Sequence, residues 1–157
     1  MSCRTVRPIE TVAFGYRFRS RLEARWAVVL DRLGLAWEYE AQGYTTAAGP
    51  YLPDFWLPQR ALWIEVKPPG DGDWRSIDPR WPAFAADGRD LAVLCGTPGE
   101  QHIHRFKGAA RLRSSRSIDF LLGDGRSWEQ VVLSAKTVDA ALLAGRQARF
   151  EHGEGPT

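Results

Sequence analysis

The fold is decided by Tyr51-Leu52-Pro53-Asp54-Phe55-Trp56-Leu57 together with the following stretch Leu62-Trp63-Ile64-Glu65-Val66-Lys67. Both segments are rich in aromatic and branched residues, which favours β-strands over Tyr51–Leu57 and Ala61–Lys67. Because side chains alternate along a strand, Glu65 and Lys67 project from one face and Ile64 and Val66 from the other. The second strand therefore presents a carboxylate and an ammonium side by side, with an apolar reverse face to anchor it.

Asp54 lies ten intervening residues before Glu65, and a turn at Pro58-Gln59-Arg60 would fold the two strands into a hairpin. Mg²⁺ prefers hard oxygen ligands and keeps several waters, so a few carboxylates and a phosphate oxygen complete its shell. Carboxylates crowded together repel one another, and such a cluster is hard to explain without a cation. The pattern therefore indicates a divalent-metal site able to cut a phosphodiester.

Ordinary structural roles are the alternative for each residue. Pro-Asp is a common turn dipeptide, and Glu65 with Lys67 could be a solvent-facing pair. Their neighbours on the strand are largely apolar, however, and charges in a buried strand require a purpose. The chain has three lysines among 21 basic residues, and a compact ammonium suits this site better than an arginine fork. Lys67 is therefore less easily explained by chance.

Bulk composition favours one globular domain spanning residues 1–157, with a flexible arm at Met1–Thr11 and a tail at Glu151–Thr157. Hydrophobic residues make up 44% and charged residues 25%, which are average values and argue against general disorder. The sequence has no long apolar run and no signal-peptide pattern, and its two cysteines form no CxxC pair. We therefore expect a cytoplasmic protein with no membrane partner, no disulfide and no zinc site.

The formal net charge is only +2, but the basic residues are unevenly distributed. Two basic runs flank an acidic centre, which suits a protein that grips a phosphate backbone around metal-binding carboxylates. An ordinary solvated surface is the alternative. The candidate nucleic-acid-binding residues are Arg17, Arg19, Arg21, Arg105, Lys107, Arg111 and Arg113.

Other elements follow from periodicity and turn residues. Apolar residues recur at helical spacing over Ser20–Leu33, and Gly34 ends the pattern. The remaining expected strands are Ala36–Tyr44, Leu91–Cys95, His102–Phe106 and Ile118–Leu122. A short helix is expected within Ser76–Ala86 and a closing helix over Val138–Phe150. The order is helix, three strands, helix, strand, followed by additional elements.

Residues 20–68 resemble the PD-(D/E)xK nuclease superfamily, and small TnsA-like endonucleases most closely. The resemblance is carried by Arg21-Leu22-Glu23-Ala24-Arg25, by Tyr51–Trp56 and by Trp63–Pro68. It implies a restriction-endonuclease-like α/β fold, in which an αβββαβ core forms a mixed sheet flanked by helices. Extra strands and a helix would follow at the C-terminus. It also implies a metal-dependent DNA endonuclease that uses Mg²⁺, with Mn²⁺ able to substitute.

By the same resemblance, Asp54 and Glu65 ligate the metal and the Val66 carbonyl adds a ligand. Lys67 orients or activates the attacking water, and Glu23 supplies a further catalytic carboxylate. Ser20-Arg21-Leu22-Glu23 is also an S-x-x-E capping box, which explains Glu23 without catalysis. Both interpretations of Glu23 stay open.

Several alternatives stay open at the level of function. The substrate could be a DNA junction, the chain could be the strand-cleaving subunit of a transposition machine, or it could bind DNA without cutting it. One active site cuts one strand, so double-strand cleavage would need a homodimer or a partner nuclease subunit. His102 and His104 share a strand face, which we expect to be solvated. Trp74 and Trp81 are expected in the core or loops, with base stacking as the alternative.

Overall fold

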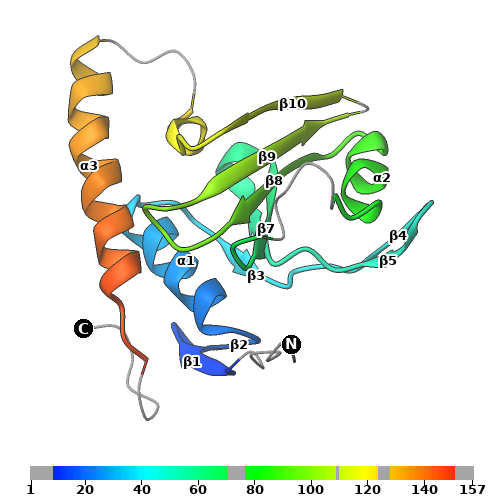
Figure 1. Ribbon diagram of the computed structural model, residues 1–157, viewed down its shortest axis with the longest axis horizontal. Coiled ribbons are helices and arrows are strands. Elements are labelled where there is room, and N and C mark those ends of the chain that lie inside the picture. The colour runs from blue at the N-terminus through cyan, green and yellow to red at the C-terminus, as the bar shows by residue number, and fades with distance from the viewer. Residues whose placement is uncertain (1–8, 71–76, 109, 124–127, 151–157) are drawn as a thin grey trace, which may run out of the picture.

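A computed structural model describes residues 9–70, 77–108, 110–123 and 128–150 of the 157-residue chain. Within these residues it is a mixed α/β fold with three α-helices and a mixed six-stranded sheet (Figure 1). The helices are α1 (Arg21–Arg32), α2 (Arg80–Ala86) and α3 (Trp128–Gln147). The strands are β1 (Thr11–Ala13), β2 (Tyr16–Phe18), β3 (Glu38–Tyr39), β4 (Tyr44–Thr46), β5 (Gly49–Tyr51), β6 (Phe55–Leu57), β7 (Leu62–Lys67), β8 (Asp90–Cys95), β9 (His102–Lys107) and β10 (Ala110–Ser115).

The main sheet has the order β10-β9-β8-β7-β6-β3. Strands β7 and β8 are parallel and are connected through α2, whereas the other neighbours are antiparallel. Strand β7 is central, and its first five residues are all buried. The hairpins β1–β2 and β4–β5 form separate two-stranded sheets, and β4–β5 projects from the body beside α2 (Figure 1).

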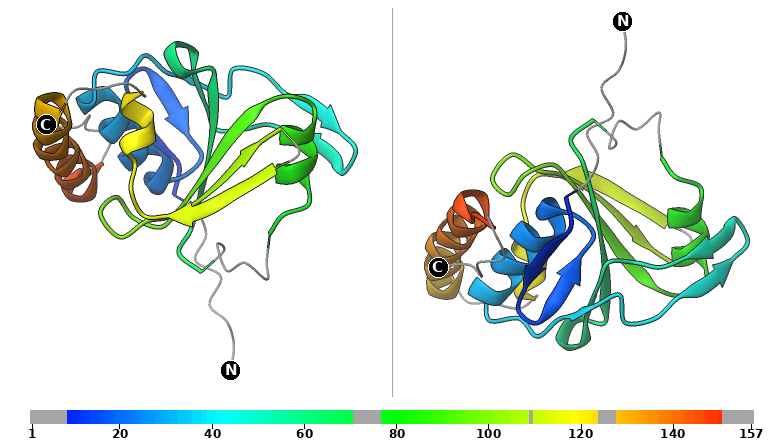
Figure 2. Two further views of the ribbon diagram at one scale, coloured as in Figure 1. Left: turned by 90° about the horizontal axis from the view of Figure 1, so that it is seen from above. Right: turned by 90° about the horizontal axis from the view of Figure 1, so that it is seen from below.

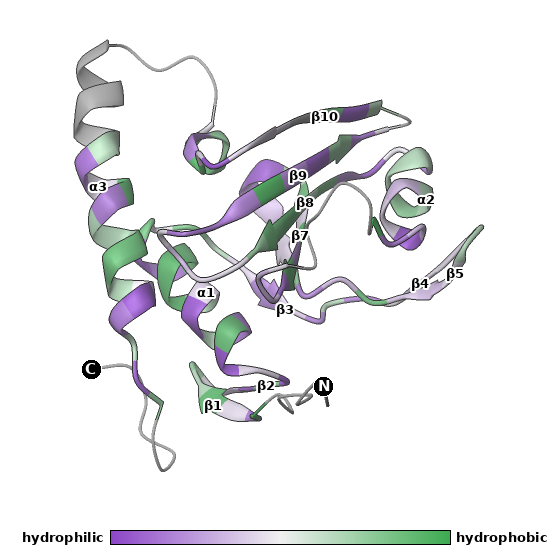
Figure 3. Cartoon of the chain, in the orientation of Figure 1, coloured by the Kyte–Doolittle hydropathy of each residue, from purple (hydrophilic) through white to green (hydrophobic). Residues whose placement is uncertain are grey.

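The two faces of the sheet carry two separate cores. Helix α1 covers one face, and α3 packs on its outer side, as the views in Figure 2 show. Ile64 and Val66 of β7 belong to this larger core, together with Trp26 of α1. On the other face α2 packs with Trp81 and Phe84 against the sheet. The hydropathy colouring of Figure 3 shows apolar stretches in β8 of the sheet and in α1.

Helix α1 begins and ends where the sequence predicts. The Ser20 hydroxyl accepts a hydrogen bond from the Glu23 amide at 3.1 Å and caps the first turn. Gly34 follows the helix with a φ of +71°, a left-handed conformation that glycine adopts at little cost. Gly145 of α3 crosses α1 so closely that a Cβ there would lie 2.4 Å from Val29 Cγ2. The absence of a side chain at this position lets the two helices pack.

Strands β7, β8 and β9, the turn at residues 58–60 and helix α2 confirm the predictions for those segments. The turn is a 3₁₀-helix at Pro58–Arg60. The prediction of one strand over Tyr51–Leu57 was wrong, because the chain bends around Asp54 and separates β5 from β6. The prediction for Ala36–Tyr44 was also wrong beyond Glu38–Tyr39, since Glu40 adopts a φ of +47° and interrupts the strand.

Further differences lie near the chain ends. Ile118–Leu122 is not a strand, because a 3₁₀-helix occupies Asp119–Leu122. Strand β10, which precedes it, was not predicted. Helix α3 starts ten residues before the predicted Val138. Thr11, at the end of the expected arm, is buried in the unpredicted β1–β2 hairpin. Residues 1–8 and the tail at Glu151–Thr157 lie outside the described residues.

Candidate active site

Asp54 is positioned by the bend between β5 and β6. Its backbone oxygen accepts from the Glu40 amide at 2.8 Å, and its side chain is almost fully buried. The carboxylate Oδ2 accepts from the backbone amide of Val66 at 2.7 Å. This bond places the carboxylate beside the end of β7, so the two halves of the sequence motif meet in space.

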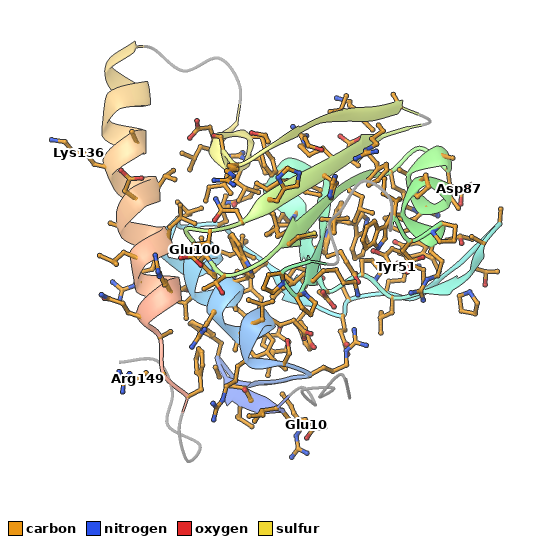
Figure 4. The ribbon with its side chains drawn as sticks, viewed as in Figure 1. Glu10, Tyr51, Asp87, Glu100, Lys136 and Arg149 are labelled. Atoms are coloured by element: carbon orange, nitrogen blue, oxygen red, sulfur yellow. The ribbon has the colours of Figure 1, made fainter. Side chains whose placement is uncertain are left out.

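Glu65 and Lys67 lie on the α2 side of β7, as the alternation of the strand predicted, and Ile64 and Val66 pack toward α1. Glu65 is buried, and its Oε1 lies 2.6 Å from the half-buried Lys67 Nζ. The phenol of Tyr51 donates to Glu65 Oε2 at 2.9 Å. Figure 4 labels Tyr51 on β5, where its side chain lies between this strand and α2. Both oxygens of Glu65 therefore have partners that fix the carboxylate.

Glu23 makes capping contacts at the start of α1 and is also close enough to Asp54 for its charge to affect that carboxyl group. Its backbone amide and Oε1 contact the Ser20 hydroxyl, which is the capping interaction. Its Oε2 accepts from the Tyr39 phenol at 2.5 Å and from the Arg19 amide at 3.2 Å. The side chain is nonetheless buried, and its charge acts on Asp54. Glu23 thus caps α1 and also belongs to the acidic cluster.

Arg19 links the cluster to solvent. Its Nη2 lies 3.1 Å from Asp54 Oδ1, and its Nε lies 2.5 Å from Glu40 Oε1. The Arg19 side chain is 57% exposed, so its positive charge lies between the buried Asp54 carboxylate and solvent. Glu40 reaches this arginine from its left-handed backbone position. Glu38, in contrast, lies exposed on β3.

Burial and crowding shift the acids toward their protonated forms. The pKa of Asp54 is raised well above its usual range by burial and by the charges of Glu65 and Glu23. Burial also raises the pKa of Glu65, although Lys67 opposes that shift. Burial lowers the pKa of Lys67, but attraction to Glu65 outweighs it and leaves the pKa above its usual value. The acids are held at an energetic cost that a further cation would relieve.

Two side chains in the site are of the type that binds a hard divalent cation. Asp54 and Glu65 offer buried carboxylate oxygens, the ligands that Mg²⁺ prefers. In the described parts of the chain, no three His, Cys, Asp or Glu side chains are arranged so that they could hold a metal ion together. Arg19 and Lys67 contact oxygens that a metal would use. Both cations are partly exposed.

The predicted nucleic-acid-binding residues do not form one surface. Through the sheet register, Arg105 and Lys107 lie on the α1 side, whereas Arg111 lies on the same side as Glu65. Arg105 stacks on Phe120 with its guanidinium carbon 4.4 Å from the ring centre. Arg17 and Arg21 are exposed near the start of α1, and the side chain of Arg113 lies outside the described residues. Among those whose side chains the structure describes, only Arg19 contacts the site acids.

The structure adds Tyr51, Asp78 and Arg80 to the site, none of which was among the predicted site residues. Tyr51 belongs to the quoted motif but gave no sign of contacting Glu65. Asp78 and Arg80 follow a proline- and glycine-rich segment, a pattern that is typical of a loop and carried no signal for this pair. Arg80 and Asp78 form an ion pair of 2.6 Å at the start of α2.

Two other expectations are also decided by burial. His102 is exposed as expected, but His104 is buried and contacts Ser114 and Arg111, so the prediction of a solvated face was wrong for His104. Trp81, on α2, is buried in the core between this helix and the sheet. Trp74 lies outside the described residues.

Comparison with protein families, with curated proteins and with solved structures finds no match to this chain. None of the helices in the described residues combines the length and apolar character needed to cross a membrane.

Proposed function

We propose that the protein is a metal-dependent DNA endonuclease with a PD-(D/E)xK site. The observation that carries the proposal is the bond between Asp54 Oδ2 and the Val66 amide, because it brings Asp54 against the strand that bears Glu65 and Lys67. Two carboxylates and an ammonium thus converge from separate parts of the chain. A solvent-exposed turn residue and a surface ion pair would not have been buried together.

The element order supports a restriction-endonuclease-like core. Helix α1 precedes β3, β6 and β7, and then α2 leads to β8, which is the αβββαβ order. The β4–β5 hairpin is inserted after β3, and β9, β10 and α3 follow the core. The acids lie on β7 and at the start of β6, next to one another in the sheet.

Asp54 and Glu65 would hold Mg²⁺ or Mn²⁺, with Glu23 behind them as a third negative charge. When bound, the metal supplies positive charge to the scissile phosphate and makes a water more acidic. Lys67 holds its proton and therefore acts as a cation and hydrogen-bond donor toward the phosphate or the attacking water. Tyr51 keeps Glu65 oriented by donating to its Oε2.

DNA is the proposed substrate because cations border the acids. Arg19 contacts Asp54, Lys67 contacts Glu65, and Arg80 lines a cavity beside them. A polyanion is drawn to such a surface. The described residues form one such site, so each protein chain would cut one strand, and double-strand breaks would need a homodimer or a partner nuclease subunit.

A cleavage assay tests the proposal. Supercoiled, linear and branched DNA are incubated with Mg²⁺, Mn²⁺ or EDTA, using wild type, Asp54→Ala and Lys67→Ala. The exposed Lys136 on α3, labelled in Figure 4, provides the matched control Lys136→Ala. Loss of one transition-state interaction typically costs about 10²–10³-fold in rate, so both site variants should lose cleavage while the control retains it. The proposal fails if wild type cuts no faster than the site variants on every substrate.

A further inference from the structure

Beside the acids lies a cavity of about 480 Å³ between the β4–β5 hairpin and α2. Its charged lining consists of three cations, Arg19, Lys67 and Arg80, and one carboxylate, Glu65. Tyr51 and Leu52 form part of its wall, and Leu52 is 37% exposed at the rim. The cavity is thus an extension of the candidate site in which the lining cations outnumber the lining carboxylates, while Asp54 and Asp78 pair with Arg19 and Arg80 from outside the lining.

Arg80 is held in this cavity by Asp78. Its Nε donates to Asp78 Oδ1 at 3.0 Å, and its Nη2 donates to Asp78 Oδ2 at 2.6 Å. The Arg80 backbone amide also donates to Asp78 Oδ1 at 2.9 Å. The ring of Tyr51 lies 5.7 Å from the guanidinium carbon. One edge of the guanidinium is therefore fixed, and its plane has a defined position against Tyr51.

The other edge of the same guanidinium is available to an anion. A guanidinium has five N–H donors, and the Asp78 fork uses those of Nε and one of Nη2. Among the residues that the structure describes, the only hydrogen-bond contact of Nη1 is a long one of 3.5 Å to the Pro50 carbonyl. The edge formed by Nη1 and Nη2 thus keeps two donors side by side, the geometry that matches two oxygens of a phosphate. Arg19 and Lys67 differ, because each contacts a site acid directly.

We propose that Arg80, positioned by Asp78, binds a second phosphate of the substrate next to the one held at Glu65 and Lys67. This assignment rests on the proposed function and refines it, because a second phosphate site requires a polynucleotide. A nucleotide ester with a single phosphodiester would leave Arg80 without its ligand. Asp78 acts through Arg80 and is a positioning residue, and Arg80 is the binding residue.

Binding is measured separately from cleavage. Fluorescein-labelled 20-mer DNA, single-stranded and duplex, is titrated in EDTA at several salt concentrations with wild type, Arg80→Ala, Arg80→Lys and Asp78→Asn. Arg80→Ala should weaken binding about tenfold and reduce the salt slope by about 0.7–0.9, the value for one phosphate contact. Arg80→Lys should keep the slope and lose about threefold in affinity, because the charge stays and the fork is lost. Asp78→Asn should behave like Arg80→Lys.

Arg146→Ala is the matched control, since Arg146 forms a comparable ion pair of 2.9 Å with Glu100 outside the cavity. Its DNA affinity should stay within about twofold of wild type. Thermal melting shows whether each variant is folded, and Arg80→Lys retains the test if Arg80→Ala does not fold.

Hydrolysis of bis(p-nitrophenyl) phosphate supplies the second readout, because this ester has one phosphate. With Mg²⁺, Arg80→Ala should raise the KM for DNA about tenfold, a larger loss than it causes in kcat/KM for this one-phosphate ester. The phosphate site is refuted if Arg80→Ala binds DNA with the affinity and salt slope of wild type, or if wild type does not bind DNA. A wild type that binds through Arg80 yet cleaves nothing refutes the nuclease and leaves the phosphate site standing.

Discussion

Replacing Asp54 with asparagine should stabilise the protein at neutral pH. Asp54 is 2% exposed, and burial together with Glu65 and Glu23 raises its pKa. Each unit by which the pKa in the folded protein exceeds that in the unfolded chain costs about 1.4 kcal/mol at a pH above both. The asparagine oxygen can still accept from the Val66 amide. The lost contact is the one to the exposed Arg19, which contributes less than about 1 kcal/mol.

We therefore expect Asp54→Asn to raise the free energy of unfolding at pH 7.5 by about 1 kcal/mol or more, or the midpoint by roughly 2–4 °C. The sign of the pH dependence follows from linkage. A raised pKa in the folded state gives stability that is present below the unfolded pKa and is lost as the pH rises through the folded pKa. Wild type should lose stability from about pH 4 upward, and Asp54→Asn should lose less of it.

The assay is urea or thermal unfolding between pH 4 and 8, in EDTA and at constant ionic strength. Glu100→Gln removes an exposed carboxylate paired with Arg146 and should change stability by less than about 0.5 kcal/mol. Two results would show that the buried carboxylate of Asp54 does not destabilise the protein. In one, Asp54→Asn is less stable than wild type at pH 7.5. In the other, its free energy of unfolding has the same pH dependence as that of wild type.

Three further outcomes are expected. At ten times its dissociation constant, Mg²⁺ should stabilise wild type by about 1.4 kcal/mol, which corresponds to roughly 3–6 °C in a thermal melt. An equal shift in Asp54→Ala, or with NaCl of matched ionic strength, would contradict binding at the acids. Tyr51→Phe removes the 2.9 Å hydrogen bond to Glu65, which lowers the Glu65 pKa, so the acidic limb of the pH–rate profile should move to higher pH. An unchanged profile would show that Tyr51 does not orient Glu65. Gly145→Ala should destabilise the protein by about 1–3 kcal/mol, because its Cβ would lie 2.4 Å from Val29 Cγ2. Leu143→Ala, at an exposed site on α3, should cost less than about 0.5 kcal/mol in the same chemical denaturation experiment. Equal effects would refute the close helix crossing.

Local sequence signals, such as capping residues and runs of apolar residues, predicted the elements that carry them. Helix α1 has a capping serine and a terminating glycine, and β7 has a dense run of apolar residues. The break at Asp54 was not visible, because its cause is tertiary: the Asp54 carboxylate bonds to the Val66 amide and its carbonyl to the Glu40 amide. Likewise Glu40 turns left-handed where alternation predicted a continuing strand.

For the site, spacing predicted the shared side of Glu65 and Lys67, since alternation is a local property of a strand. The contacts from Tyr51, Arg19 and Arg80 depend on how separate segments pack, and composition carries no trace of them. The basic run around β9 shows the same limit. Alternation along β9 puts Arg105 and Lys107 on the α1 side, whereas the β9–β10 register pairs Arg111 with Phe106 and so puts it on the other side of the sheet.

The central claim is that Asp54 and Glu65 hold a divalent cation. The most direct measurement is an anomalous difference map from crystals soaked in Mn²⁺, for wild type and for Asp54→Ala. We predict a peak between the Asp54 and Glu65 carboxylates in wild type, with Lys67 Nζ displaced from Glu65 Oε1, and no peak in the variant. A wild-type map without that peak, with Lys67 still paired to Glu65 at saturating Mn²⁺, would contradict the claim.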